Sequence, residues 1–244
     1  MSGHSKWANI KYKKGIEDRK RAKVFSKLSR LISLAAREKG GNPEANSALR
    51  AAIETAKSFN MPQENIERAI KKGTGEIEGL KLETLLLEGY GPGGIAILLE
   101  VVTDNKNRTL TEIRHLLEKF GGKLASGGVL WMFGRKGTII LDSESQERDF
   151  TREELELSAI DAGAEDIKTK ENTLEIYTRP VDLEKVKKIL EDKGIKIENV
   201  SLDFVPKEEI EVGNLEMKQK IKKLFEALDE HDDIQEIYAN IKTL

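Results

Sequence analysis

Apolar residues recur at the spacing of an α-helix in three segments near the start of the chain. Their positions are Val24, Phe25, Leu28, Leu31, Ile32 and Ala35, then Leu49, Ala52, Ile53 and Ala56, then Ile66, Ala69 and Ile70. Gly40-Gly41 ends the first predicted helix, and Asn42-Pro43 begins the second, with Asn as a cap and Pro at the first helical position. The third begins at Pro62 and ends at Gly73, which suits a left-handed cap. The pattern predicts a bundle of three short helices.

The pattern changes after residue 79, where apolar residues form short runs. Thr84–Glu88 and Ile95–Thr103 lie on either side of the turn sequence GYGPGG (89–94), which predicts a β-hairpin with a loop longer than two residues. Helical spacing returns in Thr109–Phe120, and the run Val129–Phe133 predicts a further strand.

Residues 137–204 follow a strand–helix–strand–strand–helix–strand order. The predicted elements are Thr138–Leu141, Glu153–Ala162, Asp166–Thr169, Thr173–Tyr177, Leu183–Glu191 and Ile195–Leu202. This is the order of a split βαβ, ferredoxin-like unit. A helix at Leu215–Leu228 and a strand at Ile234–Ile241 follow, and we expect them to complete the sheet begun near residue 80.

The predicted fold class is therefore α+β. We expect an N-terminal three-helix domain followed by two α/β (ferredoxin-like) domains, the last inserted into the second. The expected domains are a basic helical domain with a flexible N-terminal arm at residues 1–79, a discontinuous α/β domain at residues 80–136 and 205–244, and the inserted ferredoxin-like domain at residues 137–204.

Charge is distributed unevenly along the chain, although the formal net charge is only −2. Residues 1–79 contain 17 Lys and Arg against 9 Asp and Glu, whereas residues 142–244 contain 16 against 28. Such an asymmetry predicts a polyanionic partner for the basic end. The acidic end would repel a polyanion, so we expect it to face solvent or a basic protein partner.

The basic residues are densest before residue 40, where two aromatic residues lie among them. Cations there would neutralise phosphates and release counterions, and the aromatic rings suit stacking on unpaired bases. The candidate nucleic-acid-binding residues are Lys6, Trp7, Lys11, Tyr12, Lys13, Lys14, Arg19, Lys20, Arg21, Lys23, Lys27 and Arg30. The alternative interpretation is a solvated helix face preceded by a solubilising tail.

Two loops have a functional and a structural interpretation. A phosphate-binding glycine loop opens a helix, but GYGPGG is followed by a strand, which favours a hairpin turn. Asp104, Asn105, Asn107 and Arg108 lie between a strand and a helix. They form either a turn, with Asn107 or Arg108 near the helix start, or a functional surface loop.

The residues that carry enzyme or metal chemistry are scarce. The chain has no cysteine, and its three histidines, His4, His115 and His231, are far apart without metal-ligand spacing. The acidic run at residues 229–233 lacks the spacing of a calcium loop and predicts an acidic turn after a helix. We therefore expect no enzyme activity, no metal and no cofactor.

Apolar runs are too short for a membrane protein. The longest, Ile95–Val102, is interrupted by Glu100, and the N-terminus has no apolar signal segment. We expect a cytoplasmic protein without a membrane partner.

Several motifs together resemble the YebC/PmpR family. They are the opening SGHSKWANIKYKK, KVFSKL (23–28), LRAAI (49–53), NMP (60–62), EGYGPGG (88–94), DNKNRT (104–109) and VLWMF (129–133). One departure is Gly128, where the family often has serine, so any role of that serine would be absent here.

The resemblance implies a three-domain cytoplasmic protein in which the last domain is inserted into the second. Members of the family are described as probable DNA-binding transcriptional regulators. Relatives, including the mitochondrial translational activator of cytochrome c oxidase, are linked instead to the ribosome and to relief of stalling at proline-rich stretches. The resemblance also implies that the N-terminal arm and the loop at residues 104–109 are functional.

The predicted function is that of a non-enzymatic nucleic-acid-binding regulator, with DNA-binding transcription regulation as the leading hypothesis. Its rival is a translation factor that binds ribosomal RNA, and a protein-interaction module is the third alternative. Arg50, Gln63, Asn65 and Arg68 suit a helix-turn-helix reader, whereas the basic arm favours recognition of backbone and shape.

Overall fold

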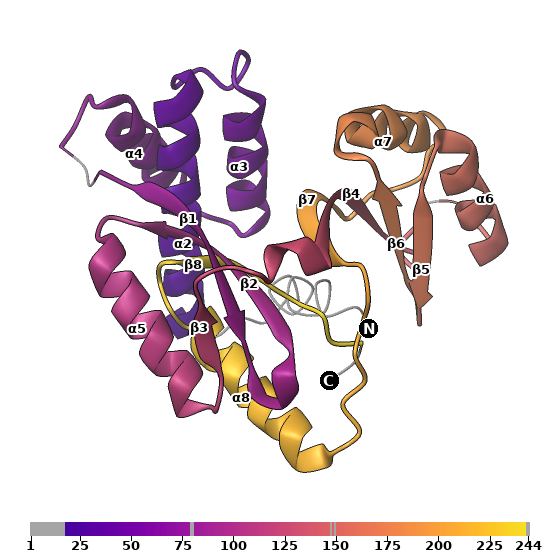
Figure 1. The fold of residues 1–244 in the computed structure, drawn as a ribbon. Coiled ribbons are helices and arrows are strands. Elements are labelled where there is room, and N and C mark those ends of the chain that lie inside the picture. The colour runs from indigo at the N-terminus through magenta and orange to yellow at the C-terminus, as the bar shows by residue number, and fades with distance from the viewer. Residues whose placement is uncertain (1–17, 79–80, 147, 149, 243–244) are drawn as a thin grey trace.

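The computed structural model describes residues 18–78, 81–146, 148 and 150–242 (Figure 1). The described residues form three N-terminal helices followed by two four-stranded antiparallel sheets, each covered by two helices. This arrangement confirms the predicted α+β fold class. None of the helices in the described ranges is long and apolar enough to cross a membrane.

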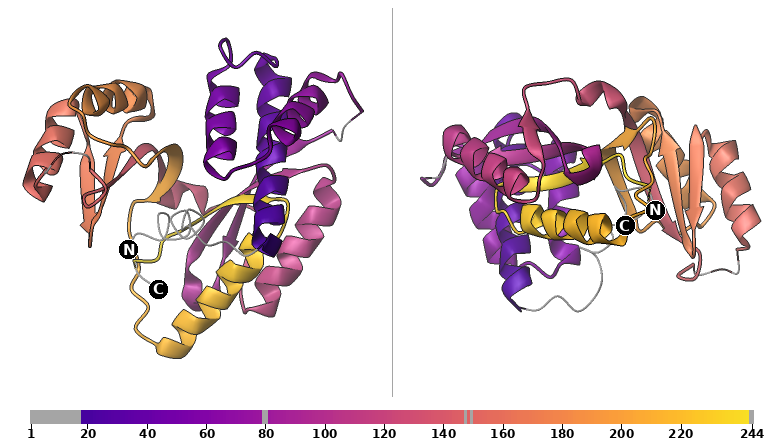
Figure 2. Two further views of the ribbon diagram at one scale, coloured as in Figure 1. Left: turned by 180° about the vertical axis from the view of Figure 1, so that it is seen from behind. Right: turned by 60° about the horizontal axis from the view of Figure 1, so that its bottom comes forward.

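The N-terminal helical domain contains α2 (Asp18–Lys39), α3 (Ser47–Ser58) and α4 (Gln63–Thr74). The apolar positions predicted from helical spacing form its core, in which Ile32, Leu49 and Ile66 are almost completely buried. The long α2 extends beyond this core, and its N-terminal half lies against the end of α8 in the middle of the molecule (Figure 2).

Two helix ends in this domain differ from the prediction. Asn46, and not Asn42, caps α3: it is fully buried, accepts a hydrogen bond from the Leu49 amide at 3.0 Å and donates to the Ala35 carbonyl at 2.8 Å. Gly73 lies inside α4, where a Cβ atom would come within 2.3 Å of the Ser33 carbonyl oxygen. Gly73 therefore allows α2 and α4 to approach, and the left-handed cap is Gly75.

The middle of the molecule is a sheet with strand order β3-β1-β2-β8. Its elements are β1 (Glu83–Tyr90), β2 (Ala96–Thr103), α5 (Lys106–Lys119), β3 (Lys123–Ala125), α8 (Leu215–Asp229) and β8 (Ile234–Ala239). β1 and β2 form the predicted hairpin, and the two helices pack on one face around Ile113, Leu117 and Phe225. Because β8 pairs with β2, the chain returns to this sheet after forming another, as the predicted insertion requires.

The second sheet has strand order β5-β6-β4-β7. Its elements are β4 (Phe133–Asp142), α6 (Arg152–Ala162), β5 (Asp166–Lys170), β6 (Thr173–Thr178), α7 (Leu183–Asp192) and β7 (Asn199–Pro206). This sheet has the split βαβ order, whereas the middle sheet opens with a hairpin. β4 and β7 both extend past residues 137 and 204, and the exact domain boundaries stay a prediction.

Three element predictions in the α/β part were wrong. Val129–Phe133 is not a strand: residues Leu130–Met132 form a 3-10 turn, η2, and the strand begins at Phe133. The short β3 was missed because three residues are too few to show a period. β7 begins at Asn199 and not at Ile195, whose side chain is buried in the core under α7.

The two sheets meet at a polar junction. The Tyr238 hydroxyl donates to Glu100 at 3.2 Å, and Arg135 bonds the same carboxylate at 2.8 Å while it stacks on Phe204. Burial raises the pKa of Asp203 at this junction to about 6, partly offset by the Ser201 hydroxyl at 2.8 Å. The folded protein therefore binds the Asp203 proton more tightly than the unfolded chain does.

Replacing Asp203 with Asn is expected to stabilise the protein above pH 7. A raised pKa means that the contribution of Asp203 is fully present below about pH 4 and is lost as pH rises through about 6. Asp203→Asn should raise the free energy of unfolding by about 1–2 kcal/mol at pH 8 and leave it unchanged at pH 4. Urea denaturation across this pH range measures the difference.

The exposed Asp192 at the end of α7 supplies the control, and Asp192→Asn should change the free energy of unfolding by less than about 0.5 kcal/mol. A constant difference between Asp203→Asn and the parent protein from pH 4 to pH 8 would contradict the assignment.

Candidate nucleic-acid interface

The structure covers only part of the basic arm predicted from the sequence. Lys6, Trp7, Lys11, Tyr12, Lys13 and Lys14 lie outside the described residues. Arg19, Lys20 and Arg21 lie in the first turn of α2, where the backbone alone is described. A role of these residues in nucleic-acid binding stays a prediction.

Three further candidates on α2 face the middle of the molecule. Lys23, Lys27 and Arg30 are four and three residues apart, so they share one side of the helix. Lys23 Nζ donates to the Glu230 carbonyl at 3.0 Å, and Lys27 Nζ contacts the Asp229 carbonyl at 2.7 Å and its carboxylate at 3.2 Å. These contacts attach the helical domain to the α8–β8 connection, and a role of Lys23, Lys27 and Arg30 in binding phosphates stays a prediction.

Asp233, directly before β8, is the centre of this attachment. Its side chain is only 1% exposed, and Arg30 from α2 and Arg108 from α5 both pair with its carboxylate, Arg108 at 2.7 Å. The hydroxyls of Thr109 and Thr103 donate to the same group at 2.6 and 3.1 Å. Burial alone would raise the pKa of Asp233, but the hydrogen bonds from Thr109 and the two arginines outweigh it and hold this pKa well below its usual range.

The loop Asp104–Thr109 has a structural role in this arrangement. α5 begins at Lys106, and its cap is Asn105, whose side chain accepts from the Arg108 amide at 3.1 Å. Arg108 also donates to Asp104 at 3.0 Å, and its hydrogen bond to the Asp233 carboxylate is the largest cause that raises the pKa of Arg108. Asn107 is exposed and lies in the first turn of α5, near the helix start as predicted, but the helix begins at Lys106 and not at Thr109. A binding role of Asp104, Asn105, Asn107 or Arg108 stays a prediction.

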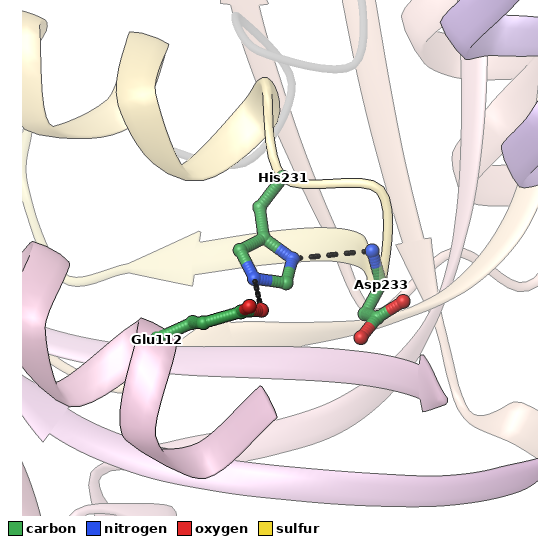
Figure 3. A group of neighbouring side chains, drawn as sticks. All are labelled: Glu112, His231 and Asp233. Atoms are coloured by element: carbon green, nitrogen blue, oxygen red, sulfur yellow. Dashed lines mark hydrogen bonds and ion pairs between the residues drawn. The ribbon is translucent and has the colours of Figure 1, made fainter. Parts of the chain in front are cut away.

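Three residues that sequence spacing did not connect lie next to one another in the structure: Glu112, His231 and Asp233 (Figure 3). Their ligand atoms lie within 4.8 Å of one another, close enough for a metal ion. However, the Asp233 amide donates to His231 Nδ1 at 3.2 Å, and His231 Nε2 lies 3.0 Å from the Glu112 carboxylate. Both oxygens of Asp233 already accept hydrogen bonds from arginine. The donor set is satisfied by protein groups and fits a hydrogen-bonded connection better than a cation site.

Exposed cations without a carboxylate partner lie on the other two helices of the helical domain. They are Arg50, Lys57, Arg68, Lys71 and Lys72, and none forms an ion pair with a described residue. Exposed glutamates on the same helices, Glu54 and Glu67 among them, make this surface mixed in charge. Arg50 and Arg68 were predicted from the sequence as candidate base readers, whereas the lysines were not singled out, although the spacing of Arg68, Lys71 and Lys72 places them on one side of α4.

Comparisons with known proteins cover nearly the whole chain. The family description "TACO1/YebC protein N-terminal domain" matches residues 5–76, and "TACO1/YebC second and third domain" matches residues 82–241. A protein of Halothermothrix orenii is 56% identical over 98% of this chain and 94% of its own length. One of Thermotoga maritima is 50% identical over 99% and 94%. Both are named "Probable transcriptional regulatory protein".

A solved structure agrees with these sequence matches. The crystal structure of a conserved hypothetical protein from Aquifex aeolicus, 47% identical, matches 98% of this chain and 97% of its own with a TM-score of 0.87. The resemblance predicted from the sequence motifs is thereby confirmed. With both family descriptions matched along its length and relatives at half identity or more, the chain belongs to the TACO1/YebC family.

Proposed function

We propose that this chain is a non-enzymatic nucleic-acid-binding regulator whose target is DNA, a transcriptional regulator of the YebC/PmpR type in the cytoplasm. The observation that carries the proposal is the group of exposed, unpaired cations on α3 and α4. Lys27 and Arg30 of α2 pair with Asp229 and Asp233. The cations of α3 and α4 and the N-terminal arm are therefore the groups that remain available to bind phosphates. The names of the relatives agree with a regulatory role.

The mode of contact is suggested by the geometry of α3 and α4. Residues 59–62 connect the two helices, as a short turn does in a helix-turn-helix pair, and Asn60 in this turn has a φ of +57°. Arg68 lies on the second helix, which reads bases in such pairs. However, Gln63 at its start donates to Glu67 at 3.1 Å, and exposed carboxylates there would repel phosphates. We therefore favour contacts with the phosphate backbone over extensive base reading.

The acidic distal part of the chain limits where a polyanion can lie. Residues 142–244 carry 28 Asp and Glu against 16 Lys and Arg. We infer that a bound nucleic acid follows the helical domain and that the second sheet unit faces solvent or a basic protein.

The proposal of a non-enzymatic role rests on the group that contains a histidine, formed by Glu112, His231 and Asp233. His231 bonds Glu112 and the Asp233 amide, and no hydroxyl or amine nucleophile of the described residues bonds its ring. The arrangement lacks the nucleophile and base pair that covalent catalysis requires.

Crosslinking in cells, followed by sequencing of both the DNA and the RNA recovered with the protein, tests the proposed target. We expect discrete promoter fragments that are enriched relative to a variant with alanine at Arg50, Lys57, Arg68, Lys71 and Lys72. Dominant recovery of ribosomal RNA would replace transcription with a ribosome-associated translation role. Recovery of neither nucleic acid above the level of the variant would contradict nucleic-acid binding altogether.

A further inference from the structure

The turn η2 presents a large aromatic side chain to solvent. Trp131 is 69% exposed and its neighbour Leu130 is 41% exposed, whereas Val129 directly before them is fully buried. Exposure of this extent is unusual for tryptophan, which is highly buried on average. A solvent-exposed tryptophan on a turn with a fixed backbone is typical of a binding surface, since aromatic side chains contribute much of the binding energy at such surfaces.

The backbone of η2 is held in place on both sides. The Glu88 carboxylate accepts hydrogen bonds from the amides of Val129 and Leu130, the latter at 2.8 Å. The Met132 amide donates to the Val129 carbonyl at 2.9 Å, and the Met132 carbonyl accepts from the Lys207 amide at 2.9 Å. Trp131 therefore loses little backbone entropy when it binds a partner.

The sequence around the turn is cationic. Residues 119–141 contain Lys119, Lys123, Arg135 and Lys136 and no Asp or Glu. Arg135 and Lys136 pair with carboxylates from other segments, but exposed Lys123 and Lys207 form no ion pair with a described residue. Glu88, the carboxylate that contacts the turn, is engaged by two amides.

The backbone before the turn is open to a ligand. Gly127 and Gly128 have φ angles of +144° and +89°, which glycine adopts without a Cβ penalty, and no atom lies within 4 Å of a Cβ built at either position. Pairing of β1 with β3 places Tyr90 opposite Lys123, and the Tyr90 hydroxyl lies 3.5 Å from the Gly128 carbonyl. An aromatic side chain, two lysines and exposed backbone thus occur around one turn.

We propose that Trp131 stacks on an unpaired base of a bound nucleic-acid strand, with Lys123 and Lys207 contacting the phosphates beside it. The inference rests on the proposed function and adds a second contact region outside the helical domain. η2, directly before β4, lies between the helical domain and the second sheet (Figures 1 and 2). Base stacking on aromatic side chains is tolerant of sequence, because every base has a π-face.

Binding of fluorescent oligonucleotides by the full chain tests this role. Trp131→Ala should weaken binding of a short oligothymidylate about 5- to 150-fold at constant salt, and Trp131→Phe should restore most of the affinity. Binding of a duplex of the same length should change less, because its bases are already stacked. Leu215→Ala is the matched control, because it removes another large apolar side chain that is exposed, in this case to 71%. Thermal unfolding of each variant should match the parent.

A second readout follows the tryptophan itself. In a Trp7→Phe background Trp131 is the one remaining tryptophan of the chain, and its fluorescence should be quenched when the oligonucleotide binds. Unchanged affinity in Trp131→Ala, with the parent still binding, would overturn the stacking role alone and would leave a protein partner as the explanation for the exposed turn. Failure of the parent to bind any nucleic acid would overturn the proposed function and this inference together.

Discussion

Replacing Asp233 with Asn is expected to lower the free energy of unfolding by about 3 kcal/mol, the largest stability effect that we anticipate for a polar substitution in this chain. The buried carboxylate accepts from Arg30 and Arg108 and from two threonine hydroxyls, and an amide cannot satisfy all of these donors. The estimate is at the low end for a buried pair because Arg108 is 41% exposed and water replaces part of its lost contact. Urea denaturation measures the change.

The neighbouring residue provides a matched control. Asp232 is exposed and forms no ion pair with a described residue, so Asp232→Asn should change the free energy of unfolding by less than about 0.5 kcal/mol. Hydrogen exchange should also show faster opening of the N-terminal half of α2 in Asp233→Asn, because Arg30 loses its anchor. Equal stability of the two variants would contradict the central role of Asp233.

The pH dependence of the same variant gives an independent measurement. The pKa of Asp233 is lower in the folded protein than in the unfolded chain, where it is about 3.9. Its contribution to stability is therefore present above pH 4 and is lost as pH falls toward the folded pKa. The Asp233→Asn variant has no carboxylate to protonate at this position, so its free energy of unfolding should not show this fall. The difference in free energy of unfolding between parent and variant should therefore become smaller below pH 4.

The helices with a regular apolar period were predicted from the sequence because each buries one face. Val24 to Ala35 pack against α3 and α4 in the core of the helical domain, as their spacing indicates. The ends of the same helices depend on contacts that are distant in sequence. Asn46 caps α3 because its amide also bonds the carbonyls of Ala35 and Gly40, and the Asn42-Pro43 pair offers a similar local signal without those contacts.

The turn at η2 shows where an apolar run misleads. Residues 129–133 are β-branched, aromatic or otherwise apolar, as in a buried strand, yet Val129 and Phe133 are buried while Trp131 faces solvent. The Glu88 carboxylate on β1 stabilises the turn by accepting hydrogen bonds from its amides, and this contact cannot be predicted from the local sequence pattern.

The candidate site could be predicted only in part for the same reason. The positive charge of α2 was visible in the sequence, but its partners Asp229 and Asp233 lie about two hundred residues away, in a run that we interpreted as an acidic turn after a helix. Asp229 does end α8, as predicted, and the acidic turn after it also binds the basic side chains of α2. Pairing across such a separation depends on the three-dimensional fold and cannot be inferred from charge counting.

The cations of the helical domain are expected to determine the salt dependence of nucleic-acid binding. Each phosphate contact contributes about 0.9 to the slope of log affinity against log salt on duplex DNA. Alanine at Arg50, Lys57, Arg68, Lys71 and Lys72 should therefore flatten this slope by about 3 to 4, since Glu54 and Glu67 keep some of these cations from full contact. Alanine at Lys11, Lys13 and Lys14 of the predicted arm and at Lys20 and Arg21 of α2 should flatten it by a similar amount. Titration of a labelled duplex at several salt concentrations gives the slope.

A third variant separates local contact from overall charge. Alanine at Lys170, Lys185, Lys187, Lys188 and Lys196 removes the same formal charge from the acidic distal part of the chain. If phosphates lie on the helical domain, this variant should keep the parent slope, because exposed charges separated by more than a Debye length of about 8–10 Å are largely screened. An equal loss of slope in all three variants would show that net charge alone governs binding. If both helical-domain variants keep the slope of the parent and the distal variant has a flatter one, the phosphates bind at the opposite end of the molecule.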